Sequence, residues 1–197
     1  MGGEVAAWDP DLYNRALRFA GEAHGEQRVP GTQISYLMHL CQVCQEAMGA
    51  VLADPTLNGD LVMQCALLHD AIEDTETTRD DVAHTFGPAI ADGADALSKR
   101  DQGPDGAPWS KVEKMGDSLS RIVAQPREVW VVKLADRVTN LQVPPGHWSI
   151  AKIEAYHHEA ETILDTLGGA SDHLAARMRT KLKAYRARWA GTPSSAT

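Results

Sequence analysis

Residues 61–75 read LVMQCALLHDAIEDT, an apolar run that is followed at once by a group of titratable residues. Apolar residues recur here at three- and four-residue spacing, which predicts a helix that begins at Asn58 or Gly59 and ends near Thr75. Charged residues are seldom buried without a partner. The polar group should therefore lie at the inward end of a mostly buried helix.

The titratable residues of this stretch are His69, Asp70, Glu73 and Asp74. On a helix, residues three and four apart share one side, so all four would crowd together within a single turn. Three carboxylates this close repel one another, and a bound cation is the simplest compensation. The alternative is a helix that merely ends in solvated acids.

Helical spacing extends along most of the chain, and no short alternating segments separated by hairpin turns interrupt it. We therefore predict an all-α fold, a single-domain helical bundle. The other helices are expected at residues 9–25, 36–52, 77–87, 88–98, 109–124, 127–141, 149–167 and 171–189, with a long loop at 100–108. Composition alone would also allow residues 129–134, VWVVKL, to form a buried strand, but we prefer a helix there.

The length of 197 residues suits one domain, which we expect at 9–189, between an N-terminal tail at 1–8 and a disordered tail at 190–197. The formal net charge of −8 disfavours a nucleic acid polymer as a partner. No apolar run approaches the roughly 18 residues of a membrane span, and no export signal begins the chain. We expect a cytoplasmic protein with no membrane partner.

Three cysteines, Cys41, Cys44 and Cys65, lie in apolar, helix-like stretches. This odd set implies no disulfide framework and fits a reducing compartment. Cys41 and Cys44 could form half of a zinc site or a redox pair. Packing in the core is favoured, because the chain has no second Cys-x-x-Cys.

Two further stretches place polar residues in apolar helices. KLADRVTNL, residues 133–141, sets Asp136 and Asn140 four residues apart, and SYLMHL, residues 35–40, sets His39 among apolar neighbours. Taken singly, each polar residue could be a hydrogen-bonded member of the core. His157 and His158 lie in an acidic stretch and are expected at the surface.

The order of His39, then His69 and Asp70, then Asp136 resembles the HD-domain metal phosphohydrolases. The closer resemblance is to the hydrolase domain of the RelA/SpoT family, especially its stand-alone small alarmone hydrolases, over about residues 10–167. The stretches that carry it are SYLMHL (35–40), ALLHDAIEDT (66–75), FGPAIADGADALSK (86–99), VVKLADRVTNL (131–141) and KIEAYHHEAETIL (152–164).

The resemblance implies a role for each matching residue. One divalent metal ion, most suitably Mn²⁺, would be held by His39, His69, Asp70 and Asp136. Glu73 and Asp74 would orient or deprotonate the attacking water. The substrate-binding residues would be Arg28, Lys99, Asn140 and Tyr156.

Two positions depart from the family pattern. The family usually has a proline directly after the first metal histidine, where this chain has Leu40. A second basic residue often follows the family arginine that Arg28 matches, where this chain has Val29. These departures concern recognition of the base and leave the implied metal ligands intact.

The activity that the resemblance implies is metal-dependent hydrolysis of the 3′-pyrophosphate of (p)ppGpp, the alarmone of the stringent response, to GDP or GTP plus pyrophosphate. No synthetase or regulatory domain is expected to follow, and the partner would be a small nucleotide. Two alternatives stay open. One is another HD-type nucleotide phosphohydrolase, acting on a nucleoside monophosphate, an adenosine alarmone or a dinucleotide cofactor, and the other is a catalytically silent HD binding module.

Overall fold

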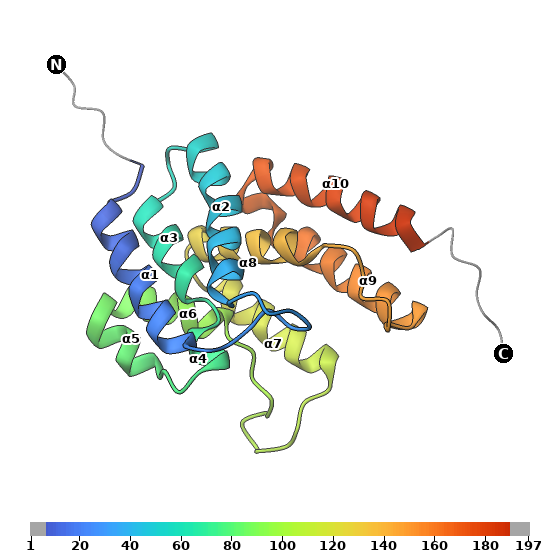
Figure 1. Ribbon diagram of the computed structural model, residues 1–197, viewed down its shortest axis with the longest axis horizontal. Helices are drawn as coiled ribbons and strands as arrows, with labels where there is room; N and C mark the ends of the chain where they lie inside the picture. Colours follow the sequence, from blue (N-terminus) through green and yellow to red (C-terminus); the bar gives the residue numbers. More distant parts are fainter. Residues whose placement is uncertain (1–6, 190–197) are drawn as a thin grey trace.

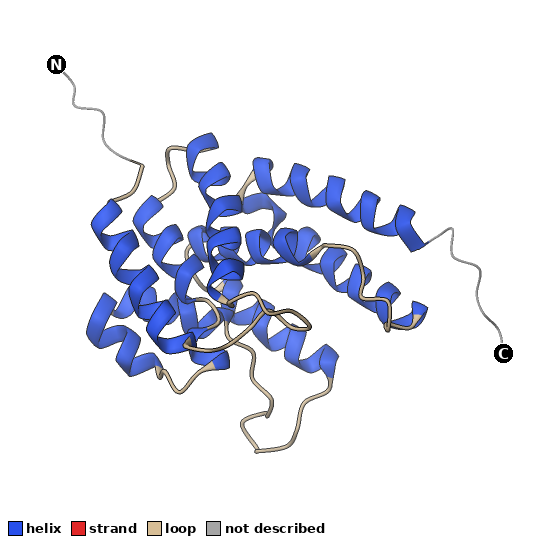
Figure 2. Cartoon of the chain, viewed as in Figure 1, coloured by secondary structure: helices blue, strands red, loops and turns tan. Residues whose placement is uncertain are grey.

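The computed structural model describes residues 7–189, and within that range the chain is helical with no strand (Figure 2). The predicted all-α fold is therefore confirmed. The predicted disordered tail at 190–197, and residues 1–6 of the predicted N-terminal tail, lie outside the described residues. The helices are α1 (Pro10–His24), α2 (Leu37–Ala53), α3 (Gly59–Leu68), α4 (Ala71–Asp74), α5 (Arg79–Phe86), α6 (Pro88–Leu97), α7 (Lys111–Val123), α8 (Arg127–Asn140), α9 (Ile150–Leu167), the short 3₁₀ helix η1 (Gly168–Ala170) and α10 (Asp172–Trp189).

Several helix boundaries are fixed by side chains that cap free backbone amides. Asp9 accepts a hydrogen bond from the amide of Asp11 at the start of α1. Thr78 begins α5 with a reciprocal capping box, in which its side chain accepts from the amide of Asp81 and the Asp81 carboxylate accepts from the amide of Thr78. Each such cap contributes about 1 kcal/mol, so these polar residues determine where the helices begin.

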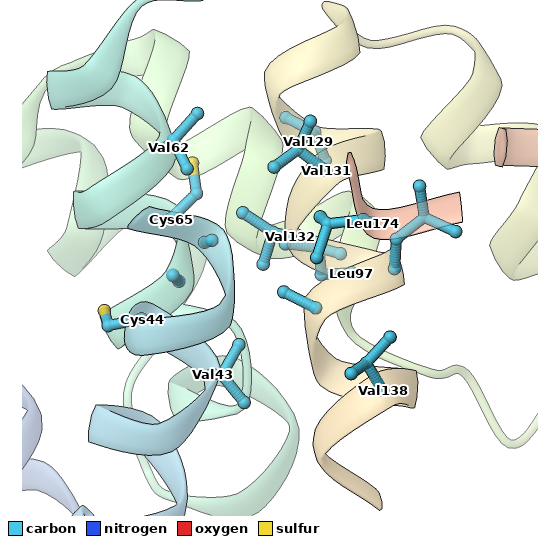
Figure 3. Packing of buried hydrophobic residues seen from close by; sticks show 14 of the residues in the cluster. Val43, Cys44, Val62, Cys65, Leu97, Val129, Val131, Val132, Val138 and Leu174 are labelled. Carbon is cyan, nitrogen blue, oxygen red and sulfur yellow. The ribbon is translucent and has the colours of Figure 1, made fainter. Parts of the chain in front are cut away.

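The centre of the core is formed by α2, α3 and α8, which pack against one another (Figure 3). Residues 62–69 and 131–139 are buried without interruption, so α3 and α8 have almost no face toward solvent. A helix that is surrounded on all sides is apolar on all sides. This explains why VWVVKL has the composition of a strand although it lies in α8.

The predicted continuous helix at 58–75 is wrong, because α3 ends at Leu68 and α4 begins only at Ala71. The Nδ1 atom of His69 lies 2.8 Å from the carbonyl oxygen of Ala66 and donates to it. In an unbroken helix that carbonyl would accept from the amide of Asp70. The side chain of His69 thus competes with the backbone at the point where the chain turns.

The cysteines pack as the sequence favoured. All three are free, Cys44 and Cys65 are buried, and Cys41 is partly exposed. A Cβ atom at Gly93 of α6 would lie 2.7 Å from the Cys65 sulfur, so α6 can approach α3 this closely only with glycine there.

The remaining helices cover this centre. Figure 1 shows α1 and α5 on one side, and α9 and α10 reaching out together on the other. The predicted loop at 100–108 connects α6 to α7 and is held by backbone hydrogen bonds from Gly103 to Ala107 and from Trp109 to Asp101. Among residues 7–189, no helix has both the length and the apolar character needed to cross a membrane.

Candidate active site

A cavity of about 300 Å³ opens where α2, α4 and α8 meet the segment before α2. It brings together most of the residues that the sequence singled out. The lining residues are Gln27, Val29, Pro30, Tyr36, His39, Asp70, Glu73, Asp74, Lys99, Lys133, Asp136 and Asn140. His69 is buried directly behind Asp70.

Three of the four residues expected to hold a metal, His39, His69 and Asp70, offer ligand atoms that all lie within 4.8 Å of one another, and Asp136 lies beside both histidines. The Nε2 atom of His39 lies 3.7 Å from Asp70 Oδ2 and 3.6 Å from Asp136 Oδ1. The Nε2 atom of His69 lies 2.9 Å and 3.8 Å from the same two oxygens. Ligands bonded to one ion at about 2.0–2.2 Å lie roughly 3–3.5 Å apart. These residues can therefore hold a divalent metal ion with little rearrangement.

The orientation of the His69 ring supports this fit. Because a carbonyl oxygen can only accept, the bond to Ala66 assigns a proton to Nδ1 of His69 and leaves Nε2 toward the carboxylates. His69 Nε2 is buried and lies 2.9 Å from Asp70 Oδ2. Metal-binding histidines are oriented in this way, with the second ring nitrogen held by a backbone carbonyl.

The charges in the cavity influence one another. Burial alone would raise the pKa of Asp70, but the His69 ring and the Tyr36 hydroxyl lower it well below its usual range. Burial likewise opposes ionisation of Asp136, yet Lys133 and His69 hold its pKa below the usual value. For His69, burial favours the neutral ring, and the carboxylate of Asp70 outweighs it and raises the pKa to about 9. Both aspartates are thus ready as ionised ligands.

The two acidic residues Glu73 and Asp74 have different hydrogen-bond partners in the structure. The Glu73 carboxylate accepts from the Lys99 side chain at 3.1 Å and from the Lys99 backbone amide at 2.7 Å, one bond to each oxygen. Asp74 accepts from the Gln27 amide at 2.9 Å through Oδ2 only. Glu73 is therefore occupied on both oxygens, whereas Oδ1 of Asp74 accepts no hydrogen bond from the described residues.

The structure adds three side chains that sequence reasoning missed. The Tyr36 hydroxyl donates to Asp70 Oδ2 at 2.5 Å, and the Lys133 ammonium, which is buried, lies 3.6 Å from Asp136 Oδ2. Both had a signal in the sequence, because each lies three residues before a predicted ligand and Lys133 interrupts an apolar run. Gln27 had no such signal.

His24 contacts two of these three residues, Gln27 and Tyr36, on the side away from the carboxylates. It is buried, its Nδ1 donates to Gln27 Oε1 at 2.7 Å, and its ring stacks on Tyr36 with centroids 5.0 Å apart. Gln27 in turn donates to Asp74, and Tyr36 donates to Asp70. One buried imidazole therefore positions the partners of two carboxylates.

Two of the predicted substrate-binding residues do not line the cavity. Arg28 is partly exposed and forms an ion pair with Glu26 at 2.8 Å. Tyr156 packs under the guanidinium of Arg137, which lies 4.4 Å from the centre of its ring. Asn140 does reach the site and donates to Asp136 Oδ1 at 2.5 Å. Binding roles for Arg28 and Tyr156 stay predictions.

Residues 16–172 match the family model of the HD domain. The chain belongs to the HD domain family. HD domains bind divalent metal ions, which agrees with the convergence of His39, His69, Asp70 and Asp136.

Relatives of this HD domain protein include both long and short chains. The GTP pyrophosphokinase rsh of Brucella ovis is 33% identical over 149 residues, which are 70% of this chain and 18% of that protein. This chain thus spans less than a fifth of that relative. The guanosine-3′,5′-bis(diphosphate) 3′-pyrophosphohydrolase MESH1 of Xenopus tropicalis is 25% identical and is matched over 92% of its length and 86% of this chain. The mouse protein of the same name is also 25% identical.

A solved structure shares the fold of this HD domain. It is described as a metazoan ortholog of SpoT that hydrolyses ppGpp, and it matches with a TM-score of 0.72 at 21% identity. The match covers 89% of this chain and 96% of the other.

Proposed function

We propose that this protein hydrolyses the 3′-pyrophosphate of (p)ppGpp, yielding GDP or GTP and pyrophosphate. The observation that carries the proposal is the close approach of two imidazoles, His39 and His69, to two ionised aspartates, Asp70 and Asp136. The same cavity is lined by Asp74, whose Oδ1 accepts no hydrogen bond from the described residues. The substrate follows from the short relatives, whose full length this chain nearly matches and whose name states that reaction. A cytoplasmic location, predicted from the sequence, belongs to the same proposal.

We propose Mn²⁺ as the ion, because a mixed set of imidazole and carboxylate ligands suits it. When bound, a divalent ion lowers the pKa of a coordinated water and neutralises charge on a phosphate. His39, His69, Asp70 and Asp136 would hold it. The hydroxyl of Tyr36 and the ammonium of Lys133 would keep the two aspartates oriented.

Asp74 is the better candidate for the base that accepts a proton from water. Both oxygens of Glu73 already accept hydrogen bonds from Lys99, so neither is left without a partner. Asp74 lies at the exposed mouth of the cavity with Oδ1 available, and Gln27 fixes its orientation through Oδ2. Glu73 would instead position Lys99.

The cavity also offers positive charge to a substrate rich in phosphate. Burial works against the charged form of Lys99, but the Glu73 carboxylate more than compensates and keeps its pKa above the usual value. In the reaction, the water oxygen bonds to the phosphorus that is attached to the 3′ oxygen, and the bond from that phosphorus to the 3′ oxygen breaks. One water proton goes to Asp74, which later returns it to solvent, and the other stays with the released pyrophosphate. The leaving 3′ oxygen takes up a proton from solvent.

The experiment is product analysis with the metal-loaded protein. Incubation with ppGpp should release GDP and pyrophosphate, while nucleoside monophosphates, adenosine alarmones and dinucleotide cofactors should remain intact. Asp136→Asn should abolish both metal binding and turnover. Asp92→Asn, which changes an aspartate paired with Arg79 on the surface, is the matched control. Orthophosphate released from a monophosphate would support the other phosphohydrolase, and no turnover of any nucleotide would support a silent binding module.

A further inference from the structure

We infer that α9 carries a second site for a transition-metal ion, formed by His157, His158 and Glu161 and separate from the cavity described above. These residues offer one ligand atom each, and the three atoms all lie within 4.8 Å of one another. The inference rests on this cluster alone and is independent of the proposed function.

The spacing of the ligand atoms suits one ion. The Nδ1 atom of His157 lies 3.4 Å from Glu161 Oε2, and the Nδ1 atom of His158 lies 2.9 Å from the same oxygen. Ligands of a tetrahedral zinc ion, with bonds of about 2.0–2.2 Å, lie roughly 3–3.5 Å apart. The distance from His157 to this oxygen already falls in that range, and the distance from His158 is slightly shorter.

His157 is the observation that separates this cluster from an ordinary surface group. The prediction that it lies at the surface is wrong, since only 6% of the residue is exposed and its ring lies 6.3 Å from that of Tyr185. The prediction was wrong because α10 covers this face of α9. Its ring makes no hydrogen bond to a described residue and faces a cavity of about 170 Å³ lined by Glu154, His157, His158, Glu161 and Arg186. The largely buried ring thus lines the same cavity as the other two members of the cluster.

The charges and donor types indicate the class of ion. Two carboxylates, Glu154 and Glu161, and one guanidinium, Arg186, line this cavity. Two imidazoles and one carboxylate suit zinc, cobalt or copper better than magnesium or calcium, which prefer oxygen ligands. His158 is exposed and Glu161 is partly exposed, so an ion can reach them from solvent.

Zn²⁺ titration of the chelator-treated protein tests the site by stoichiometry. The wild type should bind two equivalents, and His158→Ala and Glu161→Gln should each bind one. Both changes affect exposed side chains and should preserve the fold. His147→Ala, which removes an exposed histidine outside the cluster, is the control and should bind two. Asp136→Asn should also bind one, because it leaves only the site on α9.

A second measurement separates the two sites without using activity. Zn²⁺ should raise the melting temperature of Asp136→Asn, since an ion that binds only the folded state stabilises it. Adding His158→Ala to that variant should remove the shift. The inference is overturned if His158→Ala and Glu161→Gln each bind as much Zn²⁺ as the wild type, whatever the number of equivalents that the wild type binds. It is also overturned if the shift survives in the double variant.

Discussion

Replacing Tyr36 with phenylalanine removes a single hydroxyl from the support of the metal site. That hydroxyl donates to Asp70 Oδ2 at 2.5 Å, and burial together with the Asp70 charge raises the pKa of Tyr36, so it remains a donor at all ordinary pH values. Hydrogen bonds to charged groups contribute about 1.5–3 kcal/mol. Loss of a residue that hydrogen-bonds to a metal ligand lowers metal affinity about 10–100-fold, equivalent to ~1.4–2.7 kcal/mol. The two ranges agree, and we expect Tyr36→Phe to weaken Mn²⁺ binding by that factor.

The assay is competition between the protein and a chelator of known affinity, followed by Mn²⁺ titration. Tyr13→Phe is the matched control, because the Tyr13 hydroxyl makes no hydrogen bond to a described residue. The phenyl ring that Tyr36→Phe retains should still stack on His24, so the melting temperature of the metal-free protein should change little. Unchanged Mn²⁺ affinity in Tyr36→Phe, or an equal loss in Tyr13→Phe, would refute the role assigned to this hydroxyl.

Three further predictions concern the catalytic base, the proton released when the metal binds, and binding of the nucleotide. Asp74→Asn should keep the metal and lower kcat about 10²-fold, whereas Glu73→Gln should cost less; equal losses measured by steady-state kinetics would contradict the assignment of the base. In the metal-free protein the pKa of His69 is about 9, because the Asp70 charge outweighs burial, and an ion must displace that proton. Metal affinity should therefore fall about tenfold per pH unit below pH 9, and calorimetry in two buffers should detect one released proton; absence of proton release would count against it. Arg28→Ala should raise KM for ppGpp about 5–30-fold, equivalent to ~1–2 kcal/mol, with metal content unchanged. An unchanged KM would show that other residues hold the guanine ring of the nucleotide.

Helix positions followed from the sequence where a local signal exists. Asp9 and Thr78 cap their helices through contacts with residues two and three positions away, so the starts of α1 and α5 depend on neighbouring residues. The start of α5 was nevertheless predicted one residue early, at Thr77. The break after Leu68 could not, because it depends on where the His69 ring points. A periodic pattern reports which residues are apolar and not which rotamer a histidine adopts.

The four proposed metal ligands were grouped only because the resemblance connects distant stretches of chain. Spacing alone predicted a cation near His69 and Asp70, and it left His39 and Asp136 as plausible members of the core. Tyr36 and Gln27 reach the site through the packing of the segment before α2, which no local pattern encodes. The same limit applies to His157 and His158, which are adjacent in sequence and differ in exposure because α10 covers one of them.

The enclosure of α3 has a consequence for how the protein unfolds on heating. Residues 62–69 have no solvent-facing side, and the chain passes directly from them to Asp70. Backbone amides in such a helix exchange with deuterium only when the whole domain opens. Heat inactivation should therefore be cooperative, with loss of metal, loss of turnover and exposure of the α3 amides sharing one midpoint. The exposed mouth at Asp74 can fluctuate without any of these losses.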